Sequence, residues 1–149
     1  MSWIDIYRSR LMSAAEAAKI VQSGDCFWTP LCLGQPSTLI MDAIADRKNE
    51  LENVEYITLL TWRPYKIFQP EYRDTFKLIF GFYGTPILLP FANTEWADYF
   101  PLQAAEFIKK VPARKRTFQR RTGMVMQVTP PDEHGFVNIG LDAFYTETV

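Results

Sequence analysis

Two short loops hold the residues whose types and spacing could support chemistry, and the first contains Gly34, Gln35, Pro36 and Ser37. It falls between a predicted strand and a predicted helix. In open α/β sheets, ligands bind outside the carboxyl ends of the strands and near helix N-termini. Gly34 would let the backbone approach a ligand closely, and Gln35 offers both a donor and an acceptor. Spacing alone favours a simpler interpretation, a turn chosen for its backbone dihedrals.

The second loop is rich in proline and acidic residues, and consists of Pro130, Pro131, Asp132, Glu133, His134 and Gly135. Its two prolines follow an apolar run, which predicts a stiff and extended exit from the sheet. The carboxylates and the imidazole could then transfer protons from the wall of a cleft. An equal alternative is a rigid turn in which the Asp132 side chain caps its own backbone.

A third feature is the basic stretch from Lys109 to Arg121, in which seven of thirteen residues are lysine or arginine. Such a stretch could bind a phosphate-bearing ligand or nucleic acid. We favour a solvated helix end and loop, because the net charge of the chain is −1 and no nucleic-acid motif accompanies the run.

The residue types present weaken several enzyme classes. His134 is the only histidine, and it does not lie at metal-ligand spacing from Cys26 and Cys32. The glycine-rich dinucleotide motif, the P-loop and the nucleophile elbow do not occur in the sequence. Chemistry must therefore rely on carboxylates, on backbone amides or on another part of the protein, and we expect no metal site.

The chain of 149 residues, 48% of them apolar, fits a single globular domain. Its balanced charge gives no reason to expect nucleic acid or an anionic membrane as a partner. No apolar run is long enough to cross a bilayer, and the first residues do not resemble a signal peptide. Two cysteines are too few for a disulfide framework, so we expect a reduced, cytoplasmic protein.

The elements that must position these loops follow an α/β order. A helix begins at the capping box of Ser13 and Glu16 and ends at Gly24. Further helices are predicted at residues 38–48 and 102–110, and strands at residues 25–29, 54–61, 76–82, 124–129 and 136–139. Residues 62–76 are expected to be irregular. The strand–helix–strand order predicts a parallel sheet, so both loops should leave the same edge of it.

With these residues in place, the sequence resembles the N-terminal region of the acetyl-CoA hydrolase/transferase family, close to 4-hydroxybutyrate and butyryl-CoA:acetate CoA-transferases. The resemblance covers residues 3–7, 13–18, 20–25, 34–36 with the following helix, and 50–54. It is most specific at 127–140, where family members carry Ser-Pro-Pro-Asp-x-x-Gly-Tyr. Thr129 and Phe136 stand in place of that serine and tyrosine. Pro86 and Ile87 follow Gly84-Thr85, where the family has an arginine shortly after the glycine.

The resemblance implies an open, mostly parallel sheet with helices on both faces, forming one N-terminal CoA-transferase domain over residues 1–149. The family's nucleophile is a glutamate in a second domain, which these residues do not include, so we expect no catalytic residue here. The implied substrates are a coenzyme A thioester and a small carboxylate, without a permanently bound cofactor. The implied partners are the C-terminal half of the same enzyme and further copies in a homo-oligomer.

The same resemblance assigns both loops to substrate binding, where they would form a wall of the acyl pocket. The expected residues are Gly34, Gln35, Pro36, Ser37, Pro130, Pro131, Asp132, His134 and Gly135. Two other functions stay open at this point. One is an acyl-CoA hydrolase, in which water replaces the acceptor carboxylate, and the other is a catalytically inert α/β binding module.

Overall fold

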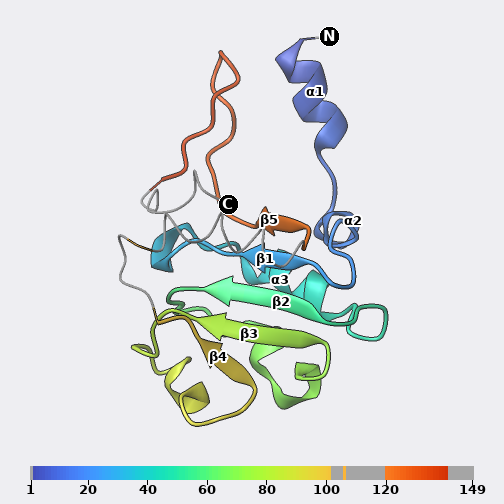
Figure 1. The fold of residues 1–149 in the computed structure, drawn as a ribbon. Coiled ribbons are helices and arrows are strands. Elements are labelled where there is room, and N and C mark those ends of the chain that lie inside the picture. The colour runs from blue at the N-terminus through green and yellow to red at the C-terminus, as the bar shows by residue number, and fades with distance from the viewer. Residues whose placement is uncertain (1, 102–105, 107–119, 141–149) are drawn as a thin grey trace.

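The computed structural model describes residues 2–101, 106 and 120–140. In this part of the chain, five strands form one sheet in the order β4-β3-β2-β1-β5, and every neighbouring pair is parallel (Figure 1). The strands are β1 (Cys26–Trp28), β2 (Val54–Thr58), β3 (Phe76–Phe80), β4 (Ala97–Tyr99) and β5 (Thr122–Met124). The parallel α/β fold predicted from the sequence is confirmed.

Helices α2 (Ala14–Ala18) and α3 (Thr38–Ala45) pack on one face of this sheet. Ala18 and Met41 from these helices join a buried cluster with Tyr56 and Leu78 of the strands. A second buried cluster contains the residues that alternate with them along the strands, namely Cys26, Trp28, Ile57, Leu59 and Ile79. Among the described residues, helices contribute to the first cluster alone, so the predicted helices on both faces are seen for one face.

The described residues also form four short 3-10 turns: η1 (Cys32–Gly34), η2 (Lys66–Phe68), η3 (Pro70–Tyr72) and η4 (Leu89–Phe91). Two of them lie in the stretch 62–76 that the sequence predicts to be irregular. Aromatic side chains from this stretch fill the core above β2 and β3, where the rings of Phe68 and Phe80 lie 5.9 Å apart. Tyr65, Phe68, Tyr72 and Phe76 are therefore core residues, whereas Trp62 is 57% exposed.

Both N-terminal helices begin with a capping box. The Ser13 hydroxyl accepts from the Glu16 amide at 3.2 Å, and the Glu16 carboxylate accepts from the Ser13 amide at 2.8 Å, as the sequence predicts. Helix α1 (Trp3–Arg10) begins in the same way at Ser2 and Asp5, but it was not predicted. Its signal is present in the sequence as Ser-x-x-Asp.

The predicted end of the second helix at Gly24 is wrong. Helix α2 ends at Ala18, because the next amides bond one residue closer: Ile20 N to Ala17 O and Val21 N to Ala18 O, each at 3.1 Å. Gly24 does take a left-handed conformation, with φ of +80°, but in the turn that leads into β1. Helix α3 likewise ends at Ala45, before the predicted limit at residue 48.

The C-terminal strands also differ from prediction. The strand expected at 124–129 is β5, shifted to Thr122–Met124, and the residues expected as a strand at 136–139 form no strand of the sheet. Instead, residues 127–139 form a hairpin in which the Thr129 amide donates to Asn138 O at 3.0 Å. Prolines 130 and 131 have no amide to donate, so this hairpin cannot carry a continuous ladder. We call it the C-terminal hairpin.

The C-terminal hairpin and α1 both extend beyond the sheet, towards the top of Figure 1. The helix predicted at 102–110 lies outside the described residues except at Glu106, and so does most of the basic stretch. None of the described helices is long and apolar enough to cross a membrane.

Candidate functional site

The strand order places a topological switch point between β1 and β5. The chain builds β1, β2, β3 and β4 outward in one direction, and β5 then pairs with the other side of β1. In open α/β sheets, ligands bind outside the carboxyl ends of the strands at such a point, because the chain leaves the two strands in diverging directions. Topology alone therefore selects the segments that follow β1 and β5.

These segments are the two loops singled out in the sequence. Gly34 follows β1, and the C-terminal hairpin follows β5. The two loops are joined by a hydrogen bond in which the Gln127 amide donates to Gly34 O at 3.0 Å. The prediction that both loops leave the same edge of the sheet is confirmed. Between them lies an open cleft of about 400 Å³, lined by Leu33, Gly34, Gln127, Val128, Thr129, Pro130, Asn138, Ile139 and Gly140. We call it the switch-point cleft.

A neighbouring cleft of about 440 Å³ lies between the start of α3 and the chain that leads from β5 into the C-terminal hairpin. It is lined by Pro36, Ser37, Ile40, Met126, Gln127 and Val128. Gln127 thus lines both clefts. Of the sequence-predicted residues, Gly34 and Pro130 line the switch-point cleft, and Pro36 and Ser37 line the neighbouring one. Ser37 is exposed, and its hydroxyl makes no capping bond to α3.

Gln35 does not face either cleft. Its side chain is fully buried, and its amide nitrogen donates to Leu60 O at 2.8 Å and to the Thr58 hydroxyl at 3.4 Å. Its amide oxygen accepts from the Thr61 hydroxyl at 2.5 Å. In this structure the amide ties the loop after β1 to the end of β2. A direct contact between Gln35 and substrate stays a prediction.

Gln35 belongs to a buried polar layer beneath the carboxyl edge, which the sequence analysis missed. Thr29, Thr58, Thr61 and Thr85 are also buried, and Thr85 donates to Thr61 O at 2.8 Å. Threonines at or shortly after the ends of buried strands were the available signal, but their pairing depends on strand register. The layer fixes three successive strand exits relative to one another.

Two buried tyrosines reinforce this layer. The Tyr65 hydroxyl donates to Pro36 O at 2.9 Å, and the Tyr56 hydroxyl bonds the Thr29 hydroxyl at 2.8 Å. Burial raises the pKa of both phenols far above the ordinary value, so both stay neutral donors or acceptors at any physiological pH. Neutral groups of the buried polar layer therefore hold the loop at Gly34 to Ser37 in place.

Asp132 caps the tip of the C-terminal hairpin, as one of the two sequence interpretations predicts. Its Oδ1 accepts from the amides of His134 and Phe136, each at 2.9 Å. His134 itself is exposed, with its Nε2 3.5 Å from Glu133, whose side chain is also exposed. Gly135 holds φ of +89°, which a side chain would disfavour. These residues make a stiff turn, and their binding of substrate stays a prediction.

The switch-point cleft is suited to binding rather than to covalent chemistry. Its described lining contains no carboxylate, imidazole or thiol, and Thr129 supplies the one hydroxyl. The carboxamides of Gln127 and Asn138, backbone groups and apolar side chains such as Val128 and Ile139 make up the rest. Across the described residues, no group of three or more histidine, cysteine, aspartate and glutamate side chains could hold a metal ion.

The described end of the basic stretch has a structural role at the opposite, amino edge of the sheet. Arg121 forms a two-pronged ion pair with Asp25 at 2.9 and 2.5 Å, and it also donates to Ile20 O. Arg120 donates to Gly24 O at 2.9 Å and lies 3.8 Å from the buried Glu55. These two arginines attach β5 to the rest of the sheet, which differs from the solvated helix end and loop that the sequence analysis favours.

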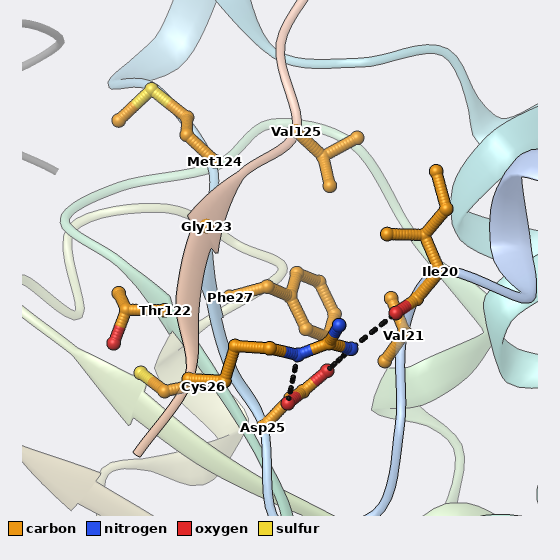
Figure 2. Close-up of a pocket in the computed structure, with 10 residues that line it drawn as sticks. Ile20, Val21, Asp25, Cys26, Phe27, Thr122, Gly123, Met124 and Val125 are labelled. Carbon is orange, nitrogen blue, oxygen red and sulfur yellow. Dashed lines mark hydrogen bonds and ion pairs between the residues drawn. The ribbon is translucent and has the colours of Figure 1, made fainter. Parts of the chain in front are cut away.

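A small pocket of about 210 Å³ lies beside the Asp25 ion pair (Figure 2). Ile20 and Val21 form one side of it, and Gly123 to Val125 form the other, with Phe27 between them (Figure 2). Asp25 already neutralises Arg121, the cation next to this pocket. This ion pair lies at the strand ends remote from the switch-point cleft.

The comparisons with known proteins find CoA-transferases among the proteins similar to this chain. No family model matches the sequence. The chain is 30% identical over 140 residues to the succinyl-CoA:cyclohexane-1-carboxylate CoA transferase of Geobacter metallireducens, which covers 94% of this chain and 30% of that protein. It is 30% identical over 147 residues to the butyryl-CoA:acetate CoA-transferase of Anaerostipes caccae, covering 96% of this chain and 31% of that protein.

Solved structures show the same fold. RipA from Yersinia pestis matches with a TM-score of 0.80 and 17% identity, over 99% of this chain and 36% of that one. The 4-hydroxybutyrate CoA-transferase from Porphyromonas gingivalis matches with a TM-score of 0.68 and 21% identity, over 99% of this chain and 32% of that one. The resemblance to CoA-transferases is confirmed, and the chain spans about a third of the length of these relatives.

Proposed function

We propose that this chain is the N-terminal part of an acyl-CoA:carboxylate CoA-transferase. The observation that carries the proposal is the 30% identity to two CoA-transferases over nearly the whole chain. The fold supports it independently, because the segments with the most specific sequence match border the cleft at the switch point. The identity of the acyl group and of the acceptor is left to experiment.

In this proposal the switch-point cleft forms one wall of the acyl pocket. The nucleophile is a glutamate in the remainder of the longer polypeptide, which fits a cleft whose described lining carries no carboxylate. The glutamate attacks the thioester carbonyl, the C–S bond breaks, and coenzyme A leaves as the thiolate. The thiolate then attacks the glutamyl carbonyl of the mixed anhydride, which releases the acyl group as a carboxylate.

The acceptor carboxylate next attacks the glutamyl-CoA thioester, the C–S bond breaks, and a second mixed anhydride forms with release of the thiolate. The thiolate then attacks the acceptor's acyl carbonyl, which forms the new acyl-CoA and frees the glutamate. Coenzyme A is thus a substrate, and the reaction needs no permanently bound cofactor. The proposal further includes a cytoplasmic location, a homo-oligomeric enzyme, and the C-terminal half of the same enzyme as the partner of this chain. Stiffness of the pocket wall matters here, because small misplacement of an acyl group lowers the rate steeply.

The test is a chimera in which residues 1–149 replace the aligned segment of the Anaerostipes caccae enzyme. We expect the chimera to transfer coenzyme A from butyryl-CoA to acetate, and the separate 149-residue chain to show no turnover above background. Circular dichroism on both proteins confirms that each is folded before activity is compared.

Each other outcome points to a different conclusion. A folded chimera that releases coenzyme A without needing acetate indicates a hydrolase. A folded chimera without either activity contradicts the proposal and favours a binding module. Turnover by the separate chain would move the nucleophile into these residues and direct attention to Glu133.

A further inference from the structure

Helix α1 presents apolar side chains to solvent between Ile4 and Tyr7. None of its residues is buried, and Ile4, Ile6 and Tyr7 are each 38–40% exposed. Leu11, directly after the helix, is 60% exposed. Residues spaced by three, four and seven positions share a helix face, so Ile4, Tyr7 and Leu11 form one stripe. An isolated helix of eight residues is not stable in water without packing of such a stripe.

The C-terminal hairpin carries apolar side chains in the same way. Phe136 at its tip is 72% exposed, and Val137 and Val128 are 47% and 40% exposed. The Asp132 cap holds the amide of Phe136, so this aromatic ring is presented on a stiff turn rather than on a loose loop. Such a preorganised aromatic residue loses little conformational entropy when a partner covers it.

The hairpin and the helix approach each other closely at Gly135 and Trp3. A Cβ atom built on Gly135 would lie 2.9 Å from Cδ2 of Trp3, which means that the indole ring lies directly on the backbone of the hairpin tip. The two segments, which extend together beyond the sheet (Figure 1), therefore form one projecting unit. We call this unit, α1 with the C-terminal hairpin, the arm.

We propose that the arm is the docking surface for the remaining two-thirds of the longer CoA-transferase polypeptide, an inference that rests on the proposed function. Soluble proteins rarely leave large apolar patches exposed, and six large apolar side chains of the arm are exposed, so we expect the arm to have a cover. The chain spans 30% and 31% of its two curated relatives, so most of such a protein lies outside these residues. The likeness to RipA extends over 99% of this chain but only 36% of that one. The arm is therefore part of a fold that occurs within a much longer chain.

The experiment mixes the 149-residue chain with the complementary two-thirds of the Anaerostipes caccae enzyme, produced as a separate polypeptide without coenzyme A. Titration calorimetry measures the association, and hydrogen exchange measures protection of residues 3–12 and 127–139. We expect binding, with exchange in both segments slowed at least tenfold and exchange in β2 unchanged. Phe136→Asp should weaken the association at least tenfold, since a charge replaces a buried aromatic contact.

Leu89→Asp is the matched control, because Leu89 is 62% exposed but lies in η4, next to β4 at the opposite edge of the sheet. It should leave the affinity unchanged. Phe136→Leu keeps an apolar side chain and should lose less than Phe136→Asp, which separates loss of contact from disturbance of the hairpin tip. Circular dichroism verifies that all variants remain folded.

Four results would overturn the proposal: no association, protection elsewhere but not in the arm, equal effects of Phe136→Asp and Leu89→Asp, or a dimer of the chain that Phe136→Asp dissociates. The last would make a second copy the occupant. These readouts need no substrate, so they are independent of the transferase assay. An active chimera with an unprotected arm would reject the docking surface alone, and a protected arm in an inactive chimera would reject the function alone.

Discussion

Replacing Gln35 with leucine tests whether the buried amide holds the loop after β1. The substitution keeps a side chain of similar size but removes both polar ends of the amide. It therefore breaks the bond to Leu60 O at 2.8 Å and the bond from the Thr61 hydroxyl at 2.5 Å. The third contact, to the Thr58 hydroxyl at 3.4 Å, is long and contributes less.

The magnitude follows from what each partner retains. Leu60 O still accepts from the Cys32 amide at 3.2 Å, and the Thr61 hydroxyl still accepts from the Arg63 amide at 3.0 Å. Neither group is left wholly without a partner, so the cost approaches that of two lost bonds rather than two orphaned groups. Each bond contributes about 1 kcal/mol, and the total should be about 2–3 kcal/mol. For a chain of this size, that lowers Tm by roughly 5–10 °C.

Urea unfolding measures the change as a lower midpoint with an unchanged slope. Gln69→Leu is the matched control: Gln69 is exposed, so the same substitution there should change stability by less than about 0.5 kcal/mol. Thr61→Val removes the same bond from the other side, and the double variant should cost less than the sum of the single variants. A change below about 0.5 kcal/mol for Gln35→Leu, or strict additivity with Thr61→Val, would refute the reasoning.

Three further perturbations follow from the contacts described. In the chimera, Asp132→Ala should lower kcat/KM about tenfold, because it removes about 1–2 kcal/mol of capping at the hairpin tip. Asp132→Asn retains an acceptor oxygen and should lower kcat/KM less. Equal kinetics for the two variants would contradict this. Arg121→Leu should destabilise the chain by about 1–2 kcal/mol in urea unfolding, because Asp25 is largely buried, whereas Lys66→Leu at an exposed ion pair should cost less than about 0.5 kcal/mol. The bonds from Ser13 lower the pKa of Glu16 in the folded state. Their contribution to the stability of α2 is therefore complete above the ordinary carboxyl pKa, and it is lost as the pH falls through the lowered pKa. Hydrogen-exchange protection of α2, taken relative to the unfolded chain at each pH, should fall over that acid range in the native chain but not in Glu16→Gln.

The parallel sheet could be predicted because its central strands are short, buried and rich in β-branched and aromatic residues. β2 and β3 were placed correctly, although both end earlier than predicted. β4 was missed, since Ala97-Asp98-Tyr99 mixes one buried residue with two exposed ones and shows no apolar run. β5 was shifted by two residues because the apolar pattern continues past Met124 into the C-terminal hairpin. Pattern alone does not tell where pairing with β1 stops.

The candidate site could be located from the sequence more reliably than its contacts could. The two loops and their common edge follow from strand direction, which local sequence indicates. Strand direction does not indicate that the Gln35 amide points inward. Its partners lie 23 to 26 residues away in the sequence and come close to it only in the folded chain. The capping role of Asp132 was one of two interpretations of the same residues, and the structure shows it.

The pairing of β1 with β5 has a consequence for the order in which the chain folds. Cys26 pairs with Thr122, which lies 96 positions further along the chain, whereas β1, β2 and β3 each pair with the next strand. Loop-closure entropy delays such a distant contact, so the four-stranded portion should assemble first and β5 should add in the final, slow phase. Until that step, the open side of β1 presents unpaired amides and carbonyls beside the apolar Phe27. Partly folded chains would then associate through this edge, and raised protein concentration during refolding should increase aggregation before β5 adds.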